Sequence, residues 1–127
     1  MKAVIASLVI LFFVTYKIQA QVSYSCTYQQ VCNWNEDIEE FENCEGHEEN
    51  SLFKMNSDET MFTHTTEEMQ STYNVNSSEY DVYTYTVTSD AGNEYFYIFD
   101  IKNKEIRVVF NHEERTLLVT FTIKSIF

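Results

Sequence analysis

The sequence predicts an all-β protein, an antiparallel meander that forms a small sandwich or barrel. From about Gln70 onward, apolar and polar residues alternate with a period of two, which is typical of half-buried strands. The chain has no proline and only two glycines, so asparagine, aspartate and serine must make most of its turns. We expect about eight strands, which bury their apolar face by closing into a barrel or by packing on an N-terminal hairpin.

Three turns indicate the register of the meander. We expect a three-residue loop at residues 90–92, where Gly92 supplies a positive φ angle, a two-residue loop at 102–103, and a four-residue loop at 112–115. Read independently, these loops keep one face of the sheet apolar without a conflict of register. The expected pairs are Val87–Tyr95, Tyr85–Tyr97, Phe99–Ile106, Tyr97–Val108, Phe110–Leu117, Val108–Val119 and Ile106–Phe121. Upstream, residues 51–55 and 60–65 read as a further hairpin.

The first twenty residues have the layout of a secretory signal peptide. Lys2 precedes the apolar run "AVIASLVILFFV", which is too short to span a bilayer, and "KIQA" ends in a small residue. We expect cleavage after Ala20, with an uncleaved membrane anchor as the alternative. Residues 21–127 then form a single domain, with an acidic, cysteine-containing segment at 21–50 and the meander at 51–127. We expect this mature chain to be secreted or periplasmic, with no membrane association.

The negative net charge of the mature chain limits the classes of partner that it can bind. Removing residues 1–20 takes away Lys2 and Lys17 and moves the formal net charge from −12 to −14. No cluster of lysine or arginine offsets that charge, so we expect no nucleic acid partner. Cations or a basic protein are more compatible.

Residues 32–50, "CNWNEDIEEFENCEGHEEN", raise the question of a metal, a redox site or an acidic loop. Part of it, "NEDIEEFENC", has Ile38 and Phe41 one helical turn apart, so we expect the segment to be irregular or briefly helical. Three cysteines remain after cleavage, and export to an oxidising compartment favours one disulfide. We favour Cys32–Cys44 over Cys26–Cys44, and pairing of Cys26 with Cys32 is sterically tight. The remaining cysteine is expected to be buried and inert.

Two metal hypotheses compete with that interpretation. Cys26, Cys32, Cys44 and His47 have the composition of a tetrahedral zinc site, but their spacing is atypical. Calcium is the stronger alternative because hard oxygen ligands abound, although no recognisable calcium-loop motif is present. Otherwise we expect no cofactor. The carboxylates for calcium would be Glu36, Asp37, Glu39, Glu40, Glu45, Glu48 and Glu49.

The outer face of the meander offers a candidate docking surface for a protein or an apolar ligand. Four apolar residues interrupt an otherwise polar face, and either a second layer covers them or a partner does. They are Phe96, Ile98, Val109 and Leu118.

No residue set singles out catalysis, and we assign no catalytic residue. None of His47, His64 and His112 stands in a recognisable nucleophile motif, and no spacing distinguishes a pair of carboxylates. We interpret the chain as a non-enzymatic binding or interaction module of unknown ligand. A calcium-dependent module built on residues 36–49 is the alternative, and a small hydrolase is the second alternative.

Several stretches resemble a group of known sequences. The leader ending in Ala-Gln, "NSDETMFTHTT" and "SDAGNEYFYIFDIKNKEI" are similar to small exported proteins of unknown function from flavobacteria and their relatives. The resemblance covers most of the mature chain and implies export and a bacterial source. It implies no activity, because the shared stretches are structural.

Overall fold

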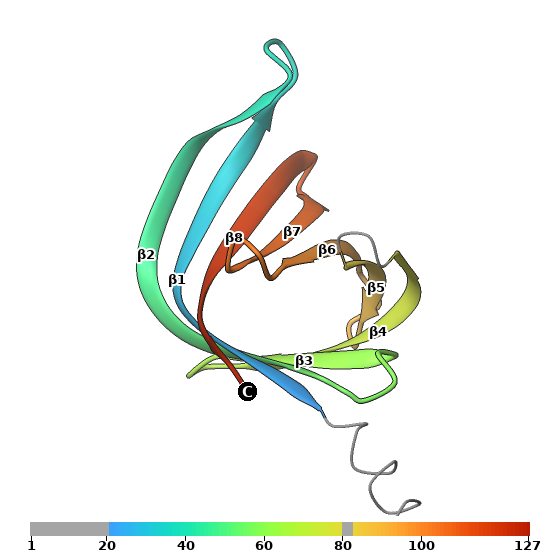
Figure 1. Ribbon diagram of the computed structural model, residues 1–127. Helices are drawn as coiled ribbons and strands as arrows, with labels where there is room; N and C mark the ends of the chain where they lie inside the picture. The colour runs from blue at the N-terminus through green and yellow to red at the C-terminus, as the bar shows by residue number, and fades with distance from the viewer. Residues whose placement is uncertain (1–20, 80–82) are drawn as a thin grey trace, which may run out of the picture.

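The chain forms a closed, eight-stranded antiparallel barrel in a computed structural model that describes residues 21–79 and 83–127 (Figure 1). Each strand pairs with the next along the chain, and β1 pairs with β8 to close the wall. The predicted meander is confirmed, and its closure is that of a barrel. The strands are β1 (Val22–Asn35), β2 (Glu40–Met55), β3 (Met61–Thr65), β4 (Gln70–Glu79), β5 (Thr84–Ser89), β6 (Glu94–Asp100), β7 (Glu105–His112) and β8 (Arg115–Ile126).

The predicted register is confirmed across β5 to β8. Val87 lies opposite Tyr95, Phe99 opposite Ile106, and Val108 opposite Val119. Gly92 has a φ of 87° in the loop after β5, as that loop requires. Local turn chemistry therefore sets this register, since each turn determines which residues face the core.

The turn between β7 and β8 is shorter than predicted. His112 and Arg115 are already paired, so the loop has two residues, Glu113 and Glu114, and not four. Both have positive φ, 49° and 65°, which is the backbone of a type I′ turn. That turn matches the right-handed twist of the flanking strands, and the twist outweighs the poor preference of glutamate for this conformation.

The prediction of an irregular or helical acidic segment is wrong. Within residues 21–79 and 83–127 the structure has no helix, and residues 36–39 are a turn between two long strands. Glu39 takes a φ of 53°, and the Asn35 side chain accepts a hydrogen bond from the Asp37 N–H at 2.9 Å. A helix of this length is marginal alone, whereas β2 satisfies its backbone by pairing with β1. The predicted boundary at residue 50 therefore falls inside β2.

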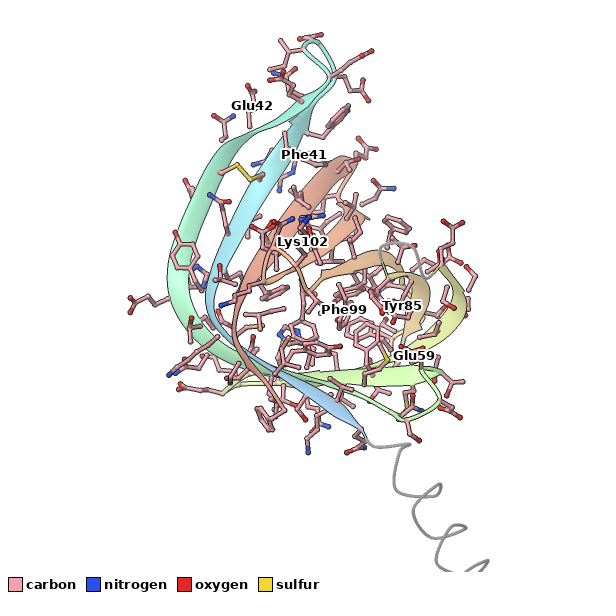
Figure 2. All side chains as sticks on the ribbon, in the orientation of Figure 1. Phe41, Glu42, Glu59, Tyr85, Phe99 and Lys102 are labelled. Atoms are coloured by element: carbon pink, nitrogen blue, oxygen red, sulfur yellow. A yellow bond between two sulfur atoms is a disulfide. The ribbon has the colours of Figure 1, made fainter. Side chains whose placement is uncertain are left out.

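Aromatic side chains fill the barrel. Phe53, Phe62 and Phe99 are at most 1% exposed, and their ring centroids lie 5.4 to 6.3 Å apart. Figure 2 shows Tyr85 and Phe99 among the rings inside the wall. Eight strands leave an interior that side chains can just fill, and here they fill it with one contiguous core. Partners outside the barrel must therefore meet its wall or its ends.

The predicted signal peptide at residues 1–20 lies outside the described residues. No helix in the part of the chain that the structure describes is long and apolar enough to cross a membrane.

Candidate docking surfaces on the wall and the β1–β2 ribbon

Three of the four predicted docking residues form one row across the outside of the barrel. Phe96 on β6 pairs with Val109 on β7, which pairs with Leu118 on β8. Their sequence neighbours Tyr97, Val108 and Val119 are buried in the core, so the row itself faces outward. Leu118 in turn lies opposite Cys32 on β1, and the row thus continues onto a fourth strand.

The fourth residue, Ile98, lies in a neighbouring row with a polar border. It pairs with Thr84 on one side and with Arg107 on the other. The Arg107 guanidinium donates to Asp100 at 3.1 Å and to Glu105 at 2.9 Å. Hydrogen bonds from Asn103 and from Arg107 hold the pKa of Asp100 below its usual range. Asp100 therefore stays ionised, and this ion cluster marks one limit of the apolar surface.

No described residue forms a second layer over these four side chains. The N-terminal hairpin does not lie over the sheet, because β1 and β2 are themselves part of the wall (Figure 1). Phe96 keeps 42% of its surface exposed, and Ile98, Val109 and Leu118 are half-buried. Among residues 21–79 and 83–127, the outer face of β6 to β8 is thus open to a partner.

The predicted disulfide between Cys32 and Cys44 is present, and it fastens β1 to β2 (Figure 2). The two Cα atoms are 4.1 Å apart across the ladder. A register shift follows Val31, and Asn43 takes a φ of 53°, so β2 has an extra residue beside Cys32. The bulge increases the twist of the β1–β2 hairpin at the point where the disulfide joins its two strands.

Cys26 is the free cysteine, and it is buried as predicted. Its side chain is 1% exposed within the core, and burial raises the pKa of its thiol to about 12. The thiol therefore stays protonated near neutral pH and is a poor nucleophile.

The zinc hypothesis is incompatible with this arrangement. Cys32 and Cys44 are oxidised to a disulfide and cannot act as thiolate ligands. His47 is exposed and bonds to Glu49 at 2.8 Å, whereas Cys26 is buried in the core. The four predicted ligands do not meet.

The seven carboxylates of the calcium hypothesis are spread along the hairpin that β1 and β2 form. Glu36, Asp37 and Glu39 belong to its turn, and the others follow along β2. A strand rises about 3.3 Å per residue, which places Glu40 and Glu48 roughly 25 Å apart. Within the described ranges no three histidine, cysteine, aspartate or glutamate side chains form a group that could hold a metal. Calcium binding by a subset of these residues stays a prediction.

The first three quarters of β2, residues 40–51, have a neighbouring strand on one side only. β1 pairs with β2 from Glu40 to Met55, but β3 pairs with it only from Leu52 to Met55. We call residues 27–50, which comprise this part of both strands and their turn, the β1–β2 ribbon. Its far end extends away from the rest of the barrel in Figure 1. Side chains from Asn43 to Glu48 are exposed on both of its faces. The sequence pattern does not predict this ribbon, because apolar and polar residues alternate only weakly along it.

An open cleft of about 690 Å³ lies where β2 and β3 separate. Leu52 and Thr65 are the last residues that pair between the two strands. N-terminal to Leu52, β2 belongs to the ribbon, whereas β3 ends at Thr65 and a turn leads to β4. Four glutamates line the cleft together with hydroxyl and amide groups. The lining residues are Thr27, Tyr28, Glu48, Glu49, Asn50, Thr66, Glu67 and Glu68.

His64 is a half-buried polar side chain whose surroundings the sequence pattern does not predict. Its ring stacks on Phe53 with centroids 4.1 Å apart and meets Phe121 edge-on at 5.0 Å. The Nε2 atom is buried without a hydrogen-bond partner. Burial lowers the pKa of His64 to about 4, so the ring is neutral at physiological pH. Its aromatic neighbours lie on other strands, so no local pattern could reveal them.

No protein-family model matches the chain, and no curated protein or solved structure is significantly similar to it. The apolar row on the wall and the β1–β2 ribbon are therefore the features that bear on function.

Proposed function

We propose that this chain is an exported, non-enzymatic interaction module that binds a protein or an apolar ligand on the outer face of β6 to β8. The observation that supports this function most directly is the uncovered row of Phe96, Val109 and Leu118. Apolar side chains in contact on an exposed wall lower the free energy of a complex when a partner removes them from water. Export is supported by the disulfide, which is typical of proteins in oxidising compartments.

A neutral apolar dye such as Nile red tests the docking surface without knowledge of the partner. We expect its fluorescence to rise with the wild-type protein and to fall markedly with the Phe96→Ser/Leu118→Ser variant. The matched control is Ile38→Ser/Met69→Ser, which removes two exposed apolar residues from turns that lie away from the row. Equal dye binding by the wild type and the double variant would contradict the proposal.

The calcium-dependent module remains the alternative, and a melting experiment separates it from the first. A cation that binds only the folded state at a hundred times its dissociation constant adds about 2.7 kcal/mol to the free energy of unfolding. In a domain of this size that is a rise of several degrees in Tm. We expect no rise when calcium replaces EDTA if the apolar surface is the binding site. A clear rise would support the calcium module.

A further inference from the structure

One edge of the β1–β2 ribbon carries unused backbone hydrogen-bonding groups. Across residues 40–50, β2 has ladder bonds to β1 only, and no other backbone hydrogen bond in the described chain involves this segment. Half of its N–H and C=O groups therefore point away from the ladder. At about 3.3 Å per residue, the free edge is roughly 35 Å long, enough for an added strand of ordinary length.

The space beside this edge is open. Residues Asn43 to Glu48 of β2 are all exposed, so this stretch of the strand is accessible to a partner. At its lower end the edge borders the 690 Å³ cleft, whose other side is the turn between β3 and β4. An extended backbone can therefore lie along β2 and enter the cleft.

The ribbon is held in the conformation that an added strand needs. The Cys32–Cys44 disulfide fastens its two strands, and Trp34 packs edge-on against Phe41 with ring centroids 5.0 Å apart. The Tyr28 ring lies directly over Gly46 and leaves no room there for a Cβ atom. β1 is also paired with β8 along its other edge. The β1–β2 ribbon therefore loses little conformational entropy when a strand binds to it.

The charge beside the edge selects the occupant. Five glutamates lie within residues 40–50, and two of them, Glu48 and Glu49, line the cleft together with Glu67 and Glu68. A second copy of this chain would bring like charges together along the paired edges, which disfavours self-association. An extended segment rich in lysine or arginine would place opposite charges there instead.

We propose that the free edge of β2 binds a basic, extended segment of another protein as an added β-strand. Backbone hydrogen bonds along residues 40–50 hold the segment, and the flanking glutamates select its charge. This inference adds a surface and a partner class to the interaction module proposed above. It uses different residues from the apolar row, so the two can fail separately.

The first experiment uses the wild-type protein and a synthetic ten-residue peptide of alternating lysine and valine. Trp34 is the only tryptophan and packs against the edge residue Phe41, so its fluorescence reports binding. Hydrogen exchange then locates the site. We expect slower exchange of amides within residues 40–50 and unchanged exchange in β6. A peptide N-methylated at alternate residues, with the same charge, should bind about tenfold more weakly or worse because it cannot complete the ladder.

A pair of charge-reversal variants tests the role of the glutamates. Glu45→Lys/Glu48→Lys should weaken binding of the unmethylated peptide by about tenfold or more. Glu79→Lys/Glu94→Lys makes the same change of net charge at exposed strand positions elsewhere, and it should stay within about twofold of the wild type.

The proposal is overturned by any of three results. These are no binding, equal binding of the methylated and unmethylated peptides, or equal weakening by the two double variants. The comparison of the two peptides needs only the wild-type protein, so it decides the question even if a variant is poorly folded. Nile red binding at Phe96 would be unaffected by such a failure, which separates this test from that of the proposed function.

Discussion

The two ends of β2 lie in opposite environments. At one end Phe53 and Met55 are at most 3% exposed and pack among the rings of the core. At the other end six successive residues, Asn43 to Glu48, are exposed. Both ends pair with β1 in one antiparallel ladder, which two register shifts interrupt. The comparison shows that ladder pairing is enough to make a strand, whereas burial requires neighbours that curve around it.

The two regions are stabilised by different interactions. In the barrel, apolar rings leave water and pack against each other, which is the dominant favourable contribution to folding. The ribbon has no such core and depends on the Cys32–Cys44 disulfide, the Trp34–Phe41 contact and its backbone ladder. The four changes below test this difference, from the largest expected effect to the smallest.

Truncation of a core ring should have the largest effect. We expect Phe53→Ala to lower the free energy of unfolding by about 3 to 5 kcal/mol, because it removes buried surface and leaves a cavity. Phe41→Ala, on the half-buried ring of the ribbon, should cost about 1 kcal/mol or less. Urea denaturation measures both. Similar losses in the two variants would mean that the ribbon contributes to a common core.

Acidification should destabilise the barrel through His64. Its pKa is about 4 in the folded protein and 6.5 for a histidine exposed to water, so the unfolded state binds the proton more readily. The stability that the neutral ring provides is fully present above pH 6.5 and is lost as the pH falls toward 4. The loss is on the order of 3 kcal/mol.

Denaturation at several pH values checks this effect. His64→Phe should flatten the dependence between pH 6.5 and 4, whereas His112→Asn, at an exposed histidine, should leave it unchanged. An unaltered pH dependence in His64→Phe would contradict the assigned role of this ring.

Loss of the disulfide should have an intermediate effect that is centred on the ribbon. For a separation of 12 residues, the chain-entropy model assigns the crosslink just under about 3 kcal/mol. We expect reduction to lower the Tm and to speed hydrogen exchange within residues 27–50 more than in β5 to β7. The Cys32→Ser/Cys44→Ser variant is the control, since a reductant should no longer change its Tm. Uniformly faster exchange would show that the crosslink stabilises the whole barrel.

Changes on the outer apolar row should have the smallest effect on folding. Phe96 is 42% exposed, so Phe96→Ser should change the free energy of unfolding by about 1 kcal/mol or less. A loss as large as that of Phe53→Ala, measured in the same urea experiment, would show that Phe96 is a structural residue. It would then be a poor candidate for docking.

Much of the barrel wall could be predicted because the relevant information is local. Alternation assigns the inward face, and each short turn sets the register of the two strands that it joins. Val87 and Tyr95, for example, are brought together by one loop at Gly92. The Cys32–Cys44 disulfide could also be predicted, because only three pairings are possible among three cysteines. The four docking residues were identified by the same alternation, as apolar side chains on the polar face.

The acidic segment could not be predicted in the same way. Ile38 and Phe41 suggested a helical turn, but Phe41 packs across the ladder against Trp34. Glutamates occupy both faces of this stretch, so it shows neither the period of a strand nor that of a helix. Only pairing with β1 decides its structure, and that is an interaction between segments.

By itself, the sequence determined the all-β class, the order of the strands, the register of the last four and the acidic character of one region. The tertiary structure alone decided that the wall closes as a barrel, that β2 keeps a free edge, and that His64 packs between rings from other strands. The physical reason is that turns and alternation act over a few residues. Closure depends on how the twist of all eight strands adds up and on which edges finally meet.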